Sequence, residues 1–380
     1  MNTYEMTNPL GSMPHYLRHL QRQGINESEF KRYSDFYLEI KARNNKIPYH
    51  ASFELTPFCN FDCKMCYIHL TDKQFEKEGL LPTSEWRNII LQAYDLGLRS
   101  VTLTGGECLM FPGFRDLYLF LHNKGIKIAV LTNGYMLDDS YCRFFELHRP
   151  SVIQITLYGS SEETYEKVTG VKAYHKVIEN LLRLRETGIP IVIGITPNRF
   201  MVKDMFSLID QVSNLGIPYH INTMLYAPRE NTGRQREDIS TDQYIELIKY
   251  TYEKKGLTAN PLNLSDISDG QTQNKKQYGL RCGGGRSSFM MRYDGFMSPC
   301  SALEHISTSV LDKGVANAWR YINEQVEKYK LPEECIECDL NKYCLHCVAI
   351  HKDAPISGHC NPSICERTTK MVEAGLLQSR

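Results

Sequence analysis

Three cysteines lie within eight residues in the first fifth of the chain, at Cys59, Cys63 and Cys66. Thiolates hold iron–sulfur clusters, and a [4Fe–4S] cube normally takes four of them. This C-x3-C-x2-C loop can occupy only three irons, so the fourth iron would stay open to a small chelating molecule. The spacing therefore predicts a cluster with one open coordination position.

Zinc is the alternative metal for this loop. Structural zinc sites prefer paired C-x2-C units that complete a closed tetrahedron, and the loop contains one such unit. A disulfide is disfavoured because cysteines this close together cannot organise a scaffold. The spacing favours the cluster.

The composition is that of a globular protein with a substantial core, with 380 residues of which 42% are apolar. The 44 basic and 44 acidic residues balance, so we expect no nucleic-acid partner and no anionic-membrane surface. No apolar run approaches the roughly 20 residues of a membrane span. Thirteen cysteines without a secretory signal predict a cytoplasmic, reducing location and metal ligation.

Apolar runs and amphipathic stretches alternate through the middle of the chain. The periodicity predicts strands at 51–56, 100–104, 127–132, 151–158, 189–196 and 219–225, and helices at 82–96, 114–123, 161–168, 175–187 and 205–215. Six β-then-α repeats imply parallel strands with right-handed crossovers. We therefore expect an α/β fold, a partial (β/α)6 barrel resembling an open TIM barrel, over residues 48–227.

Three other regions flank this barrel. Residues 1–47 have apolar positions at helical spacing and predict a short helical segment. Residues 228–281 form a polar bridging region with one helix at 241–254. Residues 282–380 contain eight cysteines and many glycines, which predict short strands in a separate small domain held by metal.

Polar segments follow the second, third and fourth predicted strands. They are Thr104-Gly105-Gly106-Glu107-Cys108, Thr132-Asn133-Gly134 and Thr156-Leu157-Tyr158-Gly159. Each alone is an ordinary βα turn. Because the C-terminal ends of consecutive parallel strands meet at one edge, these segments and the cysteine loop could share one ligand.

With these motifs, the chain resembles a radical S-adenosylmethionine (radical SAM) enzyme from about residue 50 to residue 370. The resemblance implies that Cys59, Cys63 and Cys66 hold a [4Fe–4S] cluster whose open iron binds the amino and carboxylate groups of S-adenosylmethionine. It further implies a set of contacts to that cofactor, with Gly105, Gly106 and Glu107 at the amino group, Thr156 at the ribose, Met65 and residues 195–197 including Ile195 at the adenine, and Asn133 as a further candidate.

The later cysteines resemble the SPASM extension, which carries two auxiliary [4Fe–4S] clusters. The resemblance implies one cluster on Cys282, Cys300 and Cys347, and another on Cys335, Cys338, Cys344 and a late cysteine. Cys365 matches the usual last ligand better than Cys360 does. Two residues separate Cys344 from Cys347, where three are usual, so the resemblance leaves the fourth ligand of the first cluster undecided between Cys360, substrate, water or no ligand. A zinc ribbon is the alternative, although ribbon knuckles are usually separated by roughly 15–20 residues.

Enzymes of this kind use a flavodoxin- or ferredoxin-type reductant to form a 5′-deoxyadenosyl radical that abstracts hydrogen from a substrate. The SPASM resemblance favours a peptide or protein substrate, in the maturation of a ribosomally made peptide by crosslinking or oxidation. Arg229 and Arg234 are candidate substrate contacts. The alternatives are dehydrogenation of a small molecule such as a sugar or amine, and a polyferredoxin-like electron carrier.

Overall fold

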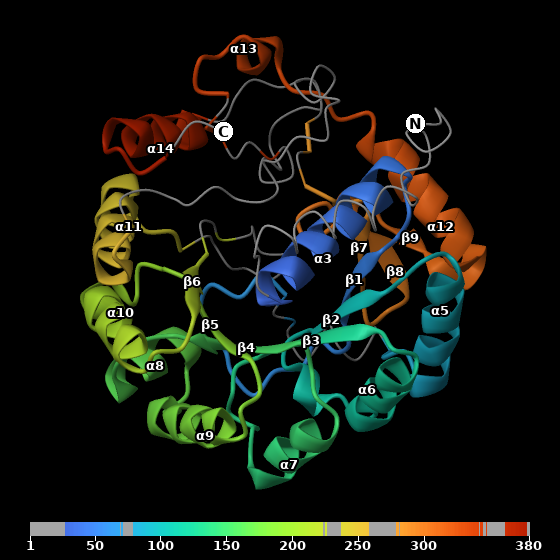
Figure 1. Ribbon diagram of the computed structural model, residues 1–380, viewed down its shortest axis with the longest axis horizontal. Coiled ribbons are helices and arrows are strands. Elements are labelled where there is room, and N and C mark those ends of the chain that lie inside the picture. Colours follow the sequence, from blue (N-terminus) through green and yellow to red (C-terminus); the bar gives the residue numbers. More distant parts are fainter. Residues whose placement is uncertain are drawn as a thin grey trace.

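The computed structural model describes residues 27–68, 70, 79–222, 225, 237–257, 279–280, 282–341, 343–344, 347 and 362–377. At its centre is a nine-stranded sheet in the order β6-β5-β4-β3-β2-β1-β7-β8-β9 (Figure 1). The first six strands follow one another along the chain, and each pairs in parallel with the next. They are β1 (His50–Glu54), β2 (Ser100–Thr104), β3 (Lys127–Thr132), β4 (Val152–Leu157), β5 (Ile191–Ile195) and β6 (Tyr219–Ile221).

Helices form a ring outside these strands (Figure 1). They are α5 (Thr83–Asp95), α6 (Phe114–Asn123), α7 (Asp139–Leu147), α8 (Glu162–Thr169), α9 (Tyr174–Glu186), α10 (Met205–Asn214) and α11 (Thr241–Lys255). Their apolar stripes face the sheet: Trp86 of α5 is fully buried, with its ring centroid 5.2 Å from that of Phe53 in β1. The predicted partial barrel is therefore confirmed.

One helix from the N-terminal region is described, α3 (Glu27–Asn44). An ion pair joins its Asp35 to Lys127, the first residue of β3, so α3 lies at the N-terminal ends of the strands. The cysteine loop and the polar turns lie at the opposite strand ends.

The C-terminal region differs from the expected separate domain. Strand β7 (Ser288–Met291) pairs in parallel with β1, and the antiparallel strands β8 (Phe296–Ser298) and β9 (Thr308–Ser309) extend the sheet. Helix α12 (Val310–Val326) then packs beside α5, where the Val315 amide donates to Gln92 Oε1 at 3.1 Å. One hydrophobic core thus runs across residue 282. Two short helices follow, α13 (Glu333–Ile336) and α14 (Pro362–Glu373).

Candidate iron–sulfur site at the strand ends

The Cys59–Cys66 loop follows β1 and is fixed to two neighbouring elements by backbone hydrogen bonds. Before the loop, the Leu55 amide donates to the Thr104 carbonyl of β2 at 2.9 Å. Within the loop, the amides of Asp62 and Lys64 donate to the carbonyls of Thr169 and Val168 in α8, at 2.8 and 2.9 Å. These bonds use no thiol, so the main chain positions the cysteines independently of any metal.

The glycine pair after β2 lies directly against the start of this loop. The Gly106 amide donates to the Thr56 carbonyl at 2.8 Å, and the Glu107 amide donates to the Phe58 carbonyl at 2.7 Å. A Cβ atom on Gly105, whose φ is +144°, would lie 2.5 Å from Thr56 O, and one on Gly106 would lie 2.2 Å from Phe58 O. Only glycine allows this close approach of two main chains.

Glu107 connects the ends of β2 and β3 through its buried carboxylate. Its Oε1 accepts from the Leu109 amide at 3.1 Å and from the Thr132 hydroxyl at 2.9 Å, while Oε2 accepts from the Asn133 amide at 2.8 Å. Burial raises the pKa of this carboxyl, and these donors oppose the shift. The carboxylate therefore positions the site; contact between Glu107 and a ligand amino group stays a prediction.

Polar groups surround the first two thiols. Asn133 Nδ2 lies 3.7 Å from Cys59 Sγ and 2.7 Å from Asn60 Oδ1, and the Phe61 amide donates to Cys59 Sγ at 3.4 Å. Burial, together with the neighbouring Cys63 thiol, raises the pKa of Tyr158. Burial, with nearby negative charge on Glu107 and Cys66, raises the pKa of Cys59 to about 12. Three ionised thiols here need a cation, and an iron–sulfur cluster supplies it.

A cluster and a single ion place different demands on the three cysteines of the loop. In the described ranges, no three His, Cys, Asp or Glu side chains are placed to hold one metal ion. A zinc site needs all its sulfurs about 2.3 Å from one point, whereas a cube takes each thiolate on a different iron. Three cysteines on a loop fixed by main-chain hydrogen bonds, with donors directed at Cys59, are compatible with the predicted cube.

The other candidate cofactor contacts lie at neighbouring strand ends. Met65 is buried within the cysteine loop. Thr156 of β4 pairs with Gly194 of β5, and the Ile195 carbonyl at the end of β5 accepts from the Asn222 amide at 2.8 Å. The structure thus places Met65, Thr156 and Ile195 around the same edge as the cysteine loop. Their contacts to S-adenosylmethionine stay predictions.

Two contacts and one electrostatic interaction link the first set of auxiliary cysteines. Cys347 forms an isolated β-bridge with Leu280, two residues before Cys282. A Cβ atom on Gly284 would lie 3.4 Å from both Cys282 Sγ and the Pro299 carbonyl, so Cys282 lies beside Cys300. Burial raises the pKa of Cys300 to about 11, and the charge of Cys282 adds to the shift.

The second set gathers around one turn and α14. The Asn341 side chain donates to the Cys335 carbonyl at 2.6 Å, and its amide donates to the Cys338 carbonyl at 2.9 Å. Thr368, three residues after Cys365 in α14, donates its hydroxyl to Cys344 Sγ at 3.8 Å. The grouping implied by the resemblance is therefore spatially possible with Cys365. Cys360 lies outside the described residues.

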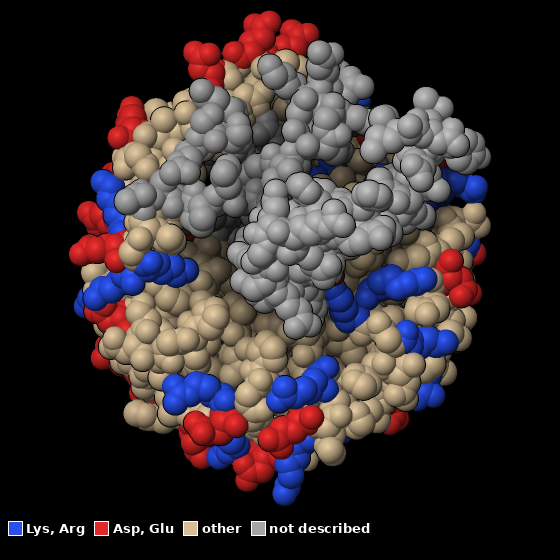
Figure 2. Space-filling view, in the orientation of Figure 1, with Lys and Arg blue, Asp and Glu red and all other residues tan. Residues whose placement is uncertain are grey.

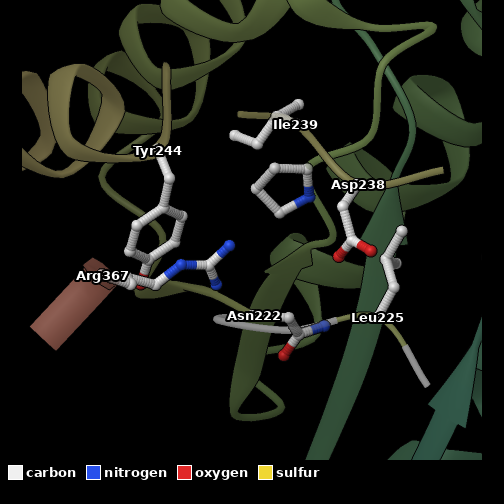
Figure 3. Close-up of a pocket in the computed structure, with 7 residues that line it drawn as sticks. Asn222, Leu225, Asp238, Ile239, Tyr244 and Arg367 are labelled. Atoms are coloured by element: carbon white, nitrogen blue, oxygen red, sulfur yellow. The ribbon is translucent and has the colours of Figure 1, made fainter. Parts of the chain in front are cut away.

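A small pocket opens where β5 and β6 end. Arg367 points into it from α14, with its guanidinium 4.5 Å from the centre of the Tyr244 ring (Figure 3). The remaining lining residues are Pro197, Asn222, Leu225, Asp238 and Ile239. Arg367 was not predicted from the sequence, because no pattern in residues 282–380 indicates that α14 reaches the barrel. The predicted substrate contacts Arg229 and Arg234 lie outside the described residues.

The surface agrees with the balanced composition. On the face in Figure 2, basic and acidic side chains of the described residues are interspersed around the rim. None of the helices described is long and apolar enough to cross a membrane.

Residues 53–209 match the family model of the radical SAM superfamily. The chain contains a radical SAM domain. This domain covers the cysteine loop and β2–β5 and ends within α10, so all the predicted auxiliary cysteines lie outside it.

Several known proteins are similar to the chain around this radical SAM domain. The "Sporulation killing factor maturation protein SkfB" of Bacillus subtilis is 23% identical over 274 residues, which are 71% of this chain and 64% of SkfB. The "AdoMet-dependent heme synthase" of Nitratidesulfovibrio vulgaris is 22% identical, covering 78% of this chain and 86% of that protein. The match thus spans less than two thirds of SkfB.

A solved structure also shares the fold. Streptococcus suis SuiB bound to S-adenosylmethionine superposes with a TM-score of 0.67 at 16% identity, covering 95% of this chain and 89% of SuiB. At this identity the similarity concerns the fold, which extends beyond the radical SAM domain into the C-terminal region.

Proposed function

We propose that this chain is a radical SAM enzyme with a SPASM extension that reductively cleaves S-adenosylmethionine and abstracts hydrogen from a peptide or protein. The observation that carries the proposal is the three-cysteine loop at the end of β1, joined by main-chain hydrogen bonds to Gly106 and Glu107 at the end of β2. An electron carrier requires neither an incomplete ligand set nor a cofactor edge formed by several strands.

The bound [4Fe–4S] cluster would supply an electron and an open iron for the cofactor's amino and carboxylate groups. Cys59, Cys63 and Cys66 would hold it. Gly105 and Gly106 keep the β2 main chain close enough to the loop for its polar atoms to face the cofactor. Glu107 positions this segment and is a candidate acceptor for the cofactor ammonium. Met65, Thr156 and Ile195 would line the nucleoside and exclude water from the radical.

We further propose two auxiliary clusters, the first on Cys282, Cys300 and Cys347 and the second on Cys335, Cys338, Cys344 and Cys365. They would accept the electron left after the substrate radical loses a proton or closes a bond. A flavodoxin- or ferredoxin-type protein would supply the first electron. No disulfide joins any of the described cysteines, which supports a reducing, cytoplasmic location.

The assignment of a peptide substrate rests on the relatives. SkfB is named as the maturation protein of a sporulation killing factor, and SuiB has also been solved with its precursor peptide SuiA. The similarity to a heme synthase over 78% of the chain supports the second candidate, oxidation of a small molecule.

Mass spectrometry tests this proposal. The enzyme is incubated without oxygen with a chemical reductant, S-adenosylmethionine and the short peptides encoded beside its gene. We expect 5′-deoxyadenosine and a peptide two hydrogens lighter. Modification of a sugar, amine or porphyrin, with every peptide unchanged, would favour the small-molecule candidate. Unchanged mass with one inverted α-carbon would keep the peptide class and exclude crosslinking. If neither methionine nor 5′-deoxyadenosine forms, the chain does not cleave S-adenosylmethionine, and the electron-carrier alternative is favoured.

A further inference from the structure

The ends of β3 and β4 each direct a hydrogen-bond donor at one thiol of the Cys59–Cys66 loop. Asn133 follows β3 and is 5% exposed, with Nδ2 3.7 Å from Cys59 Sγ. Tyr158 follows β4, and its ring packs on Phe61 of the loop, next to Cys63, whose thiol interacts with the Tyr158 hydroxyl. The separation at Cys59 is within the reach of a hydrogen bond to sulfur, whose radius exceeds that of oxygen.

The orientation of the Asn133 amide is fixed from both ends. Its Oδ1 accepts from the Tyr135 amide at 3.0 Å, so Nδ2 must face the loop, where Asn60 Oδ1 accepts at 2.7 Å. One amide nitrogen has two hydrogens, so it can serve Asn60 and Cys59 together. The main-chain bond from the Asn133 amide to Glu107 Oε2 holds this residue at the edge of the site.

The Tyr158 ring is held by aromatic contacts. Its centroid lies 6.1 Å from that of Phe61 and 5.8 Å from that of Tyr165, with edge-to-face angles of 73° and 87°. Phe61 belongs to the cysteine loop and also packs against Tyr135, with the centroids 5.8 Å apart. The Tyr158 hydroxyl is therefore presented to Cys63 by a rigid set of rings.

A donor to a cysteine sulfur favours the redox state in which the cluster carries more negative charge. The reduced state carries one electron more, so each such hydrogen bond raises the reduction potential. We propose that Asn133 and Tyr158 tune the potential of the cluster held by Cys59, Cys63 and Cys66 by donating hydrogen bonds to two of its sulfurs. Both are positioning residues, and the inference rests on the proposed function.

The test is a reductive titration of the anaerobically reconstituted full chain, followed by electron paramagnetic resonance. The signal that shifts when S-adenosylmethionine is added identifies the cluster with the open iron among the proposed three. Tyr158→Phe removes only the hydroxyl and keeps the ring contacts. Asn133→Asp keeps the oxygen that accepts from the Tyr135 amide and replaces the donor nitrogen with a second oxygen. The Asn60 side chain can adapt to this change. Its Nδ2 has no hydrogen-bond partner among the described residues, so the Asn60 amide can turn and donate to the new oxygen.

Tyr135→Phe is the matched control. It removes a hydroxyl from the other tyrosine that packs on Phe61, and this side chain is 36% exposed. We expect Tyr158→Phe to lower the ratio of reduced to oxidised cluster at a fixed potential by about tenfold, equivalent to about 59 mV for one electron. Asn133→Asp should lower the ratio further because it adds a negative charge. Tyr135→Phe should leave it unchanged.

The iron content and the response to S-adenosylmethionine distinguish a failure of the tuning role from a failure of the proposed function. Full iron with a lowered potential in Tyr158→Phe and an unchanged Tyr135→Phe supports the tuning role. Full iron with an unchanged potential in Tyr158→Phe overturns the role of Tyr158, and the same result in Asn133→Asp overturns that of Asn133. If the wild-type chain shows no signal that responds to S-adenosylmethionine, the proposed function itself fails, and the inference fails with it.

Discussion

The two groups of cysteines in this chain are organised in opposite ways. Cys59, Cys63 and Cys66 lie on one loop whose main chain is bonded to β2 and α8. The C-terminal cysteines come from several segments between Cys282 and Cys365, and contacts such as the Leu280–Cys347 bridge and the Thr368–Cys344 hydrogen bond bring them together.

The difference indicates that the protein main chain positions the first group of cysteines, whereas bound metal helps to position the second group. The first loop is attached to a parallel sheet with a continuous core, so its geometry should survive without a cluster. In the C-terminal group, Cys335, Cys338, Cys344 and Cys365 follow α12, beyond the sheet, where short helices and turns provide little core of their own. Metal binding there should contribute directly to folding.

The largest expected effect comes from replacing Cys59, Cys63 and Cys66 together by alanine. Formation of 5′-deoxyadenosine should cease, and iron should fall by about four atoms per chain. The thermal midpoint of unfolding should change little, because no thiol contributes to the main-chain bonds of the loop. Product analysis, iron determination and calorimetry check these outcomes. Continued reductive cleavage by the triple variant would refute the assignment of this loop.

The opposite pattern is expected for Cys335, Cys338 and Cys344 replaced together by alanine. Iron should again fall by about four atoms per chain, but reductive cleavage of S-adenosylmethionine should continue. Residues after α12 should become more sensitive to limited proteolysis, because their folding is coupled to the metal. Stoichiometric zinc in the wild-type chain, with only about four irons, would contradict this prediction and support the ribbon alternative.

The sequence predicted the barrel more completely than the tail. Helix α6 was predicted at 114–123 and is observed at Phe114–Asn123. The prediction succeeds because each βα repeat packs its helix on the sheet, so the helix shows apolar residues at helical spacing. Helix α12 was missed, although it buries Val315, Trp319 and Ile322. Cysteines and glycines dominate the tail, and the pairing of His50 in β1 with Ser288 in β7 joins distant segments that no local pattern connects.

The candidate site was predictable as far as topology determines it. Parallel strands bring their C-terminal ends to one edge, so the Gly-Gly-Glu segment and Asn133 were expected beside the cysteine loop. The hydrogen bond from Asn133 to the Cys59 thiol and the position of Tyr158 next to Cys63 depend on side-chain orientation and were not predictable. The saturation of the Glu107 carboxylate by protein donors was missed for the same reason.

Two glycine substitutions test whether main-chain contacts organise the Cys59–Cys66 loop. Gly106→Ala would place a Cβ 2.2 Å from Phe58 O, which should destabilise the fold by about 1–3 kcal/mol and lower iron retention. Gly216→Ala is the control: Gly216 has φ +65° and open space around its Cβ position, so it should cost roughly 1 kcal/mol without loss of iron. Denaturant unfolding and iron analysis measure both. Equal iron content in the two variants would show that the close approach at Gly106 is dispensable.

Glu107→Gln tests whether this residue positions the site or contacts the cofactor. An amide group in place of the carboxylate must direct its NH2 toward a donor, either the Asn133 amide or the Leu109 amide and Thr132 hydroxyl. The resulting unpaired group should lower the free energy of unfolding by about 1–3 kcal/mol, and affinity for S-adenosylmethionine should fall by about tenfold as the strand ends shift.

Thr132→Val is the control, because it removes one donor to Glu107 and keeps the carboxylate. It should lower the free energy of unfolding by about 1 kcal/mol and change the affinity for S-adenosylmethionine less than Glu107→Gln does. Denaturant unfolding and calorimetric titration separate the two roles: a parallel loss of stability and affinity supports positioning. Lost affinity at unchanged stability would instead mean that the Glu107 carboxylate binds the cofactor ammonium directly.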